Sequence, residues 1–346
     1  MKSTLKILLV VIFFNIFLIV TTDVMAYEIQ TGLTHDCHEQ MAMDSFETFI
    51  QNNNVTNYNN LILPADSSWD SYSDYFFGNL LESYTDKKIR FIAASLLIGV
   101  RWPDEHGLSV TSTEALYANH GDPDNQFEHF LRSQDDDYIE GNITALSKSK
   151  IFFQNRVLNA ALYLFENPDD RIVEIKEYVE FYGVITFQLF APAYYLGTAM
   201  HSLQDSFSHT VRTDDLKQIL SVLNFADAVT ENFNEQRDGI AHSYHMDECK
   251  SDDDNKQIIK VSKKVSLQLL QILSSDSIND AETITDNIIE EWLTYKPGCG
   301  FDNNYCNSKW LPVIRQDPTA PFLTCNVSTV GYKHFSLIEA IDKLLF

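Results

Sequence analysis

The stretch 199-AMHSLQDSFSHTVR-212 places His201, Asp205 and His209 at four-residue steps. Successive residues of an α-helix are rotated by about 100°, so these three side chains share one stripe of a helix. Apolar neighbours such as Met200 indicate that this helix is packed in the protein, where polar groups are costly to bury without partners. Imidazole and carboxylate groups together suit zinc, and the stripe therefore predicts a metal site.

The spacing within this stripe also predicts how many ions are involved. His201 and His209 are separated by about 12 Å of helix rise, which is too far for both to bind one zinc ion. Asp205 lies between them, and a carboxylate has two oxygens with which it can bridge two ions. The sequence therefore predicts a site with several metal ions, in which Asp205 is the bridging ligand.

Other histidines and acidic residues gather in short clusters at helix or loop boundaries. The clusters are 32-GLTHDCH-38, 98-IGVRWPDEHG-107, 119-NHGDPDNQFEHFLRS-133 and 237-RDGIAHSYHMDEC-249. A single histidine near a helix end is commonly a cap or a solvated side chain, and His38, His106 and His334 are given that interpretation. The clusters themselves are candidates for further ligands.

The first residues of the chain predict its compartment. Lys2 and Lys6 precede an apolar run over 7–20, and 24-VMA-26 offers the small residues that a signal peptidase recognises. We expect residues 1–26 to be a secretory signal peptide, with a mature chain that begins at Tyr27. Later stretches fall short of the roughly 20 apolar residues of a membrane helix. The protein is expected to be secreted, outside the cell or in a periplasm.

Composition narrows the set of partners. The formal net charge is −24, which repels phosphate backbones, so no nucleic-acid partner is expected. Acidic clusters of this kind fit bound cations instead. In an exported protein the five cysteines are expected to be mostly oxidised, with one left over. Cys299 and Cys306 enclose a short loop and are the expected bridge, whereas spacing alone does not pair the other cysteines.

The hydrophobic pattern is predominantly helical, and alternating apolar and polar stretches are scarce. Helical spacing occurs over 35–53, 88–101, 146–166, 169–206, 214–236, 255–275 and 280–294. The predicted fold is all-α, with a single multi-helix domain over 27–296 and a small irregular Cys-containing cap over 297–346. Pro192 interrupts the run 169–206, and the helix that carries the metal stripe is expected to start near it.

These pieces resemble the bacterial zinc-dependent phospholipase C family. The resemblance lies in 191-APAYYLGTAMHSLQDSFSH-209, 33-LTH-35, 102-WPD-104 and 129-HFLRS-133, which follow one another in the family's order. It covers roughly residues 27–250. It implies a secreted, helical enzyme with a trinuclear zinc site. The tail does not resemble the lipid-binding β-sandwich of some family members.

The resemblance also implies a set of zinc ligands. These are His35, Asp104, His129, His201, Asp205, His209, His242 and Asp247, together with the α-amino group of Tyr27, where the family has tryptophan. Two choices stay open at this stage. His120 competes with His129, and His245 with Glu248 could replace His242 with Asp247, because the family's late His-x3-Glu spacing does not occur here.

The activity that the resemblance implies is hydrolysis of a glycerophospholipid such as phosphatidylcholine, giving diacylglycerol and a phosphorylated head group. The substrate would be met at a membrane or micelle surface, and no stable protein partner is implied. About three zinc ions per chain are expected, with Asp104 as the residue that orients or deprotonates the attacking water. Two alternatives remain: a zinc-dependent nuclease of the same fold, and a secreted helical binding protein without enzymatic activity.

Overall fold

The computed structural model describes residues 37–53, 61–108, 122–167, 170–179, 183–226, 228, 232–247, 249 and 253–316. Several residues that the sequence singles out lie outside these ranges. They are the signal peptide 1–26, Tyr27, His35, His120, Glu248, Cys325 and His334.

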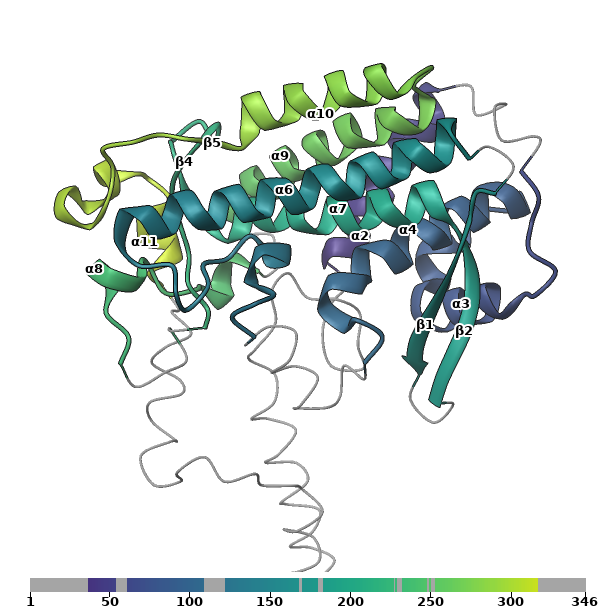
Figure 1. Ribbon diagram of the computed structural model, residues 1–346, viewed down its shortest axis with the longest axis horizontal. Coiled ribbons are helices and arrows are strands. Elements are labelled where there is room, and N and C mark those ends of the chain that lie inside the picture. The colour runs from purple at the N-terminus through teal and green to yellow at the C-terminus, as the bar shows by residue number, and fades with distance from the viewer. Residues whose placement is uncertain are drawn as a thin grey trace, which may run out of the picture.

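Most of the described chain is helical (Figure 1). The longer helices are α2 (Cys37–Asn52), α3 (Ser68–Leu81), α4 (Lys87–Glu105), α6 (Tyr138–Phe165), α7 (Ala191–Ser208), α9 (Asp253–Leu270) and α10 (Ile278–Trp292). The short helical turns are η2 (Gln126–His129), α8 (Glu235–Asp238), η4 (Tyr244–Met246), η5 (Gln271–Ser274), η6 (Phe301–Asn307) and α11 (Leu311–Ile314). The expectation of a mainly helical body is thus confirmed.

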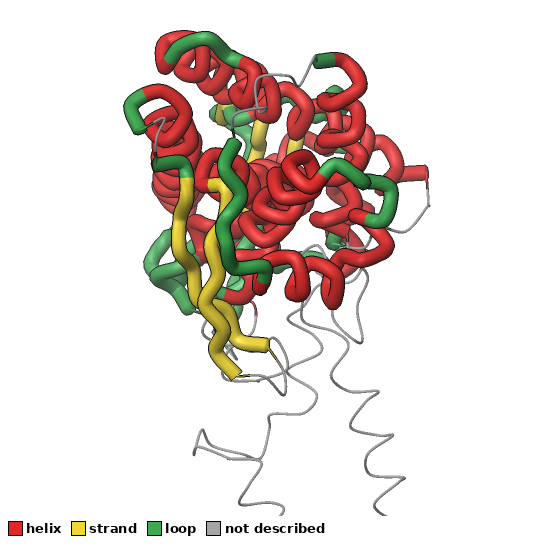
Figure 2. Tube along the Cα trace, turned by 90° about the vertical axis from the view of Figure 1, so that its right-hand side faces the viewer, coloured by secondary structure: helices red, strands yellow, loops and turns green. Residues whose placement is uncertain are grey.

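Two small sheets show that the fold is not all-α. Strands β1 (Ile172–Val179) and β2 (Gly183–Phe190) form an antiparallel hairpin along one side of the helices (Figure 2). Strands β3 (Thr210–Arg212), β4 (Gln218–Val222) and β5 (Thr294–Tyr295) form the second sheet, in the order β3-β4-β5.

These strands correct two of the predicted helices. The run 169–206 is helical only from Ala191 onward, and the described part of 214–236 contains β4. Both segments have β-branched and aromatic residues, which favour extended backbone when neighbouring strands and helices cover them. In the hairpin, Ile175 pairs with Phe187 and both side chains are buried. Packing therefore outweighs the helix-like spacing in these segments.

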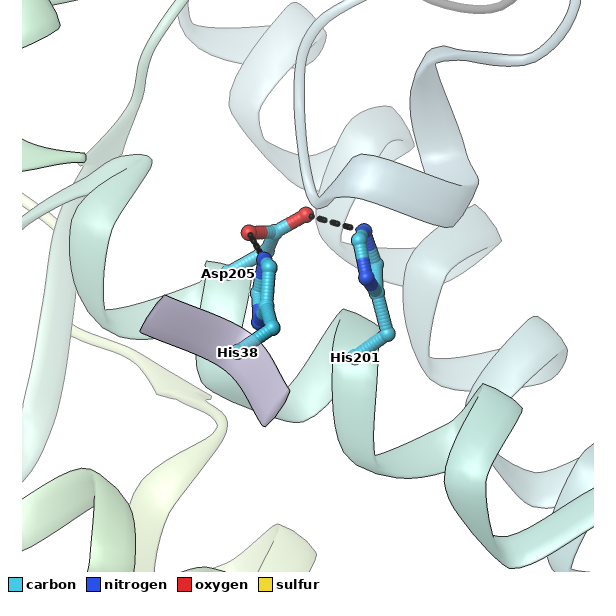
Figure 3. Close-up of side chains that lie close together, drawn as sticks. All are labelled: His38, His201 and Asp205. Carbon is cyan, nitrogen blue, oxygen red and sulfur yellow. Dashed lines mark ion pairs between the residues drawn. The ribbon is translucent and has the colours of Figure 1, made fainter. Parts of the chain in front are cut away.

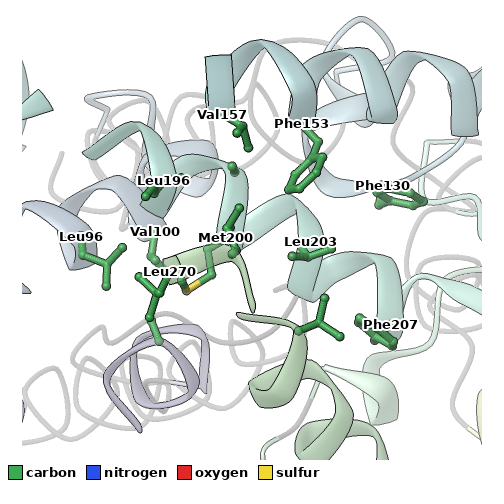
Figure 4. Close-up of a cluster of buried hydrophobic side chains, with 14 of the residues drawn as sticks. Leu96, Val100, Phe130, Phe153, Val157, Leu196, Met200, Leu203, Phe207 and Leu270 are labelled. Atoms are coloured by element: carbon green, nitrogen blue, oxygen red, sulfur yellow. The ribbon is translucent and has the colours of Figure 1, made fainter. Parts of the chain in front are cut away.

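Helix α7 lies at the centre of the fold. Figure 1 shows α6, α9 and α10 running alongside it, with α2 and α4 below, and the core side chains surround it in Figure 4. Its first turn contains Pro192, as predicted, because a proline ring suits a position whose N–H has no helical partner. Leu196, Met200 and Leu203 are buried in the core.

Helices α4 and α7 approach each other through two glycines. A methyl group on Gly99 would lie 2.0 Å from the carbonyl oxygen of Tyr194, and one on Gly197 would lie 2.2 Å from that of Leu96. Neither position has room for a larger residue. This close approach fixes the last turn of α4, which ends at Glu105, against the middle of α7.

The described part of the cap packs on the same core as the helices. Trp310, Leu311 and Ile314 are buried there, and the hydroxyl of Ser308 donates to the carbonyl of Arg212. Cys299 and Cys306 form a disulfide, as predicted, and a second disulfide joins Cys37 to Cys249. Both bonds are compatible with an extracellular protein. Within the described ranges, no helix has the length and apolar character needed to cross a membrane.

Candidate metal centre

Seven of the predicted ligands are brought together around α7. Helix α7 carries His201 and Asp205, and His209 follows it directly. The others come from the last turn of α4, from η2 and from the loop after α8; they are Asp104, His129, His242 and Asp247. All seven are at least 97% buried. Buried polar side chains at this density require partners that satisfy them.

Among the described residues, three groups of ligand atoms are close enough to hold metal ions. They are His38, His201 and Asp205; Asp104, His129 and His201; and His209, His242 and Asp247. Within each group the ligand atoms lie within 4.8 Å of one another. The prediction of a site for several ions therefore agrees with the arrangement of these side chains.

Asp205 is shared between two sets of imidazoles. Its Oδ1 lies 3.1 Å from Nε2 of His38, and its Oδ2 lies 3.1 Å from Nε2 of His201 (Figure 3). Oδ2 also lies 3.3 Å from Nδ1 of His129. The two oxygens of the carboxylate therefore face different histidines, as those of a bridging ligand would.

The partners of Asp205 differ from those predicted. A straight helix would place Asp205 between His201 and His209, but His209 lies beyond the last helical residue and leaves the stripe. Its Nδ1 is 3.9 Å from Oδ2 of Asp205, whereas its Nε2 lies 3.1 Å from Oδ1 of Asp247. The imidazole that faces Oδ1 of Asp205 is instead that of His38.

The third group is built around Asp247. Its Oδ2 lies 2.9 Å from Nε2 of His242, and the Nε2 atoms of His209 and His242 are 3.1 Å apart. Ligands on a tetrahedral zinc ion with bonds of 2.0–2.1 Å are separated by roughly 3.3 Å. The separations in this group and around Asp205 are thus those of atoms that can share a cation.

The hydrogen bonds of three imidazoles fix which nitrogen can bind a metal. Nδ1 of His201 lies 2.8 Å from the carbonyl oxygen of Val100, and Nδ1 of His38 lies 2.6 Å from Oε1 of Gln204. Nδ1 of His209 pairs with the carbonyl oxygen of His129. Carbonyl and amide oxygens only accept hydrogen bonds, so Nδ1 of each of these three histidines carries the proton. When the ring is neutral, Nε2 has the lone pair, and this lone pair points toward a carboxylate. The lone pair of Nε2 and the carboxylate oxygen are both acceptors, and two acceptors this close to each other need a cation or a proton between them.

The pKa values of the central residues favour a cation in the first two groups. Burial, followed by the charge of His38, lowers the pKa of His201 to about 3, so this imidazole is neutral at pH 7. Burial alone would raise the pKa of Asp205, but His201 and His209 outweigh it and hold the pKa well below its usual range. An ionised carboxylate beside the neutral imidazole of His201 attracts a metal ion.

Two further pKa values are shifted in the opposite direction. Burial, then the charges of Asp205 and Glu39, raises the pKa of Asp104 well above its ordinary value. Burial would lower the pKa of His209, but Asp205 and Asp247 outweigh it and raise the pKa to about 9. In the metal-free chain, Asp104 and His209 therefore each hold a proton, which supplies the positive charge that a metal ion would otherwise bring.

Leu223 and Asn224 are hydrogen-bonded through their backbones to three segments that carry candidate ligands. The amide of Leu223 donates to the carbonyl of His209 (2.8 Å), and the carbonyl of Leu223 accepts from the amide of Arg132 (2.9 Å). On the other side, the amide of His242 donates to the carbonyl of Asn224 (2.9 Å). These bonds link the segments after α7, after η2 and after α8. The sequence did not reveal them, because they join backbone groups far apart in the chain.

Only part of each ligand alternative lies among the described residues. His129 belongs to a group, and so do His242 and Asp247, whereas His245 is half-buried and in none of the three groups. His120 and Glu248, like the predicted ligands Tyr27 and His35, lie outside the described residues.

His38 is the site residue that the sequence interpretation missed. The sequence predicts a cap or a solvated side chain at this position, but His38 is fully buried against Asp205. A signal was present, since His38 shares one face of α2 with Ala42, Phe46 and Phe49, which are all core residues. A histidine on such a face implies a buried partner. His106, in contrast, is the C-terminal cap of α4, as expected, and its ring pairs with Glu128.

Comparison with known proteins adds no family to this description. No family model, no curated protein and no solved structure matches the chain. The function is therefore inferred from the chemistry of the three groups and from the motifs in the sequence.

Proposed function

We propose that the protein is a secreted zinc metallophosphodiesterase that hydrolyses glycerophospholipids of the phosphatidylcholine type. The products are diacylglycerol and the phosphorylated head group. The observation that carries this proposal is the carboxylate of Asp205, whose two oxygens each face imidazoles at 3.1 Å. About three zinc ions per chain fit the three groups of His and Asp side chains.

The mixture of donors supports zinc as the metal. Each group combines imidazole nitrogens with a carboxylate, which suits zinc, whereas magnesium and calcium prefer shells made of oxygen alone. The Nδ1 atoms of His38, His201 and His209 each contact an oxygen of the protein, the outer contact that orients a zinc-binding histidine. The groups thus offer both the ligands and their supports.

Closely spaced metal ions suit hydrolysis of a phosphodiester. Bound zinc would neutralise the phosphoryl oxygens and lower the pKa of a bound water toward about 7. Asp104 would accept a proton from that water or act as a ligand. In support of this role, its Oδ1 lies 3.8 Å from Nδ1 of His129 and its Oδ2 lies 3.7 Å from Nδ1 of His201. His38, His201 and His129 hold Asp205 in place from two sides.

Charge and compartment support a phospholipid substrate outside the cell. The formal net charge of −24 fits a zwitterionic choline head group better than an anionic lipid surface or a nucleic acid. The two disulfides are compatible with secretion. The substrate would be bound at a membrane or micelle surface.

Zinc-dependent release of phosphocholine from phosphatidylcholine tests the proposal. Asp205→Asn keeps the size of the side chain and removes its charge, and should lower the rate about a hundredfold or more. Asp215→Asn is the matched control, because Asp215 lies in an exposed turn. Asp104→Asn with zinc still bound but activity lost would assign Asp104 as the base.

The other outcomes separate the alternatives. Zinc-dependent cleavage of single-stranded nucleic acid without release of phosphocholine would indicate a nuclease. Higher activity on phosphatidylglycerol than on phosphatidylcholine vesicles would contradict the head-group preference. A folded chain without bound zinc would leave a non-enzymatic binding protein as the explanation.

A further inference from the structure

Three consecutive residues at the start of α2 are attached to three different ligand-bearing segments. Cys37 is bonded to Cys249, His38 contacts Gln204 on α7, and Oε1 of Glu39 lies 3.6 Å from Nη1 of Arg101 on α4. His38, the middle residue, belongs to the first metal group. The start of α2 therefore connects parts of the centre that the rest of the chain brings in separately.

Of these three attachments, only the one at Cys37 is covalent. The Cα atoms of Cys37 and Cys249 are 5.4 Å apart, although 212 positions separate them in the sequence. Cys249 follows Asp247 by two residues, a length of chain that spans at most roughly 7 Å. The bond thus keeps His38, from the first group, close to Asp247, from the third group.

We propose that the Cys37–Cys249 disulfide is a positioning element of the metal centre, so that the zinc affinity of the chain depends on its oxidation state. The inference rests on the zinc centre of the proposed function. Reduction would let the start of α2 and the segment after Asp247 move apart. The ligands would then have to be reordered each time a metal binds, and that ordering opposes binding.

The bond is accessible to a reductant. Cys249 is exposed, whereas Cys37 is buried, so attack occurs at Sγ of Cys249 and Cys37 is the leaving thiolate. A water-soluble phosphine supplies the two electrons. It takes up the oxygen of one water molecule to become a phosphine oxide, and the two protons of that water complete the two thiols.

The second disulfide of the chain is a matched control. Cys299 is buried and Cys306 is exposed, so the two bonds are alike in their access to solvent. Cys299 and Cys306 are only seven positions apart, and no member of the three metal groups lies between or next to them in the sequence.

Zinc affinity is first compared between two double variants. In Cys37→Ser with Cys249→Ser, competition with a chelator should show affinity 10–100-fold below that of the native chain, the usual cost of losing an outer support of a metal ligand. Cys299→Ser with Cys306→Ser should bind zinc as the native chain does. Equal affinities in the two folded variants would overturn the inference.

A second measurement uses the native chain, so it decides the matter even if the first variant does not fold. If the disulfide favours zinc binding, zinc must in turn favour the disulfide, because the coupling is reciprocal. Phosphine reduction of each bond is followed by alkylation and mass spectrometry, with zinc or with a chelator. Zinc should slow reduction of Cys37–Cys249 severalfold and leave Cys299–Cys306 unchanged.

The outcomes separate this inference from the proposed function. A native chain that binds zinc, but whose Cys37–Cys249 bond is reduced at the same rate with and without it, overturns the inference alone. A native chain that binds no zinc overturns both.

Discussion

Nε2 of His38 lies 3.1 Å from Oδ1 of Asp205, although the two residues belong to helices α2 and α7. The other oxygen of Asp205 faces His201 on its own helix. Asp205 thus belongs to the first metal group with His38 and His201, and its Oδ2 also lies 3.3 Å from Nδ1 of His129 in the second group. The position of α2 therefore becomes part of the centre.

Replacing His38 by alanine should remove one of about three zinc ions from the chain. His38 belongs only to the first group, and the third group, around Asp247, shares no residue with it. Zinc content is measured by elemental analysis after dialysis. His106→Ala is the control, because His106 is half-buried, pairs with Glu128 and belongs to none of the three groups. Full zinc content in the His38 variant would show that this histidine is not a ligand.

Gln204→Ala should weaken zinc binding 10–100-fold without unfolding the chain. The amide of Gln204 accepts from Nδ1 of His38 and donates to the hydroxyl of Ser266 (3.2 Å), so its loss frees the imidazole to rotate. Chelator competition gives the affinity. Gln257→Ala, in an exposed position next to Lys309, should bind zinc normally. Equal affinities in both variants would contradict an orienting role for Gln204.

Gly197→Ala should lower both stability and zinc affinity. The added methyl group would meet the carbonyl oxygen of Leu96 at 2.2 Å and push α4, which carries Asp104, away from α7. Overpacking of this kind costs about 1–3 kcal/mol, measured by chemical denaturation. At Gly78 on α3, nothing lies within 4 Å of the added methyl group, so Gly78→Ala should leave stability unchanged or slightly raised. A Gly197 variant as stable as the native chain would show that the two helices can separate freely.

The metal-free protein should lose stability as the pH rises from about 6.5 to 9. The pKa of His209 is raised to about 9 because Asp205 and Asp247 outweigh its burial, whereas the unfolded value is about 6.5. The folded state therefore holds this proton more tightly, and its contribution is complete below pH 6.5 and lost through pH 9. The expected loss is about 3 kcal/mol in the free energy of unfolding.

Denaturation in the presence of a chelator, at several pH values, measures this loss. His209→Gln should remove the slope, because its side chain does not titrate. Bound zinc should also flatten the profile, since the metal replaces the proton. A slope that persists in the His209 variant would assign it to another group.

The parts of the centre that the sequence predicts are those that lie close together in one helix. The position of Pro192 predicts where the helix starts, and the four-residue step from His201 to Asp205 predicts its polar stripe. Both predictions follow from helix geometry. His209 departs from the stripe because the helix ends before it. The periodicity did not show where that end lies.

The parts that the sequence did not predict depend on contacts between distant segments. The spacing over 169–206 predicts a helix where β1 and β2 form a hairpin, because the burial of this hairpin comes from other elements. The hairpin also includes the buried carboxylate of Glu177, which breaks a simple apolar pattern. The pairing of Cys37 with Cys249 likewise follows from the packing of α2 and not from spacing. His38 shows the intermediate case, since its place on the apolar face of α2 was visible but its partner was not.

The number of zinc ions in the native protein tests the central claim most directly. Elemental analysis of the secreted chain, together with anomalous diffraction at the zinc edge, gives both the count and the ligands. The account predicts about three ions per chain, with Asp205 bound to two of them. A native, folded chain that takes up no zinc, or binds it away from Asp205, would contradict the account.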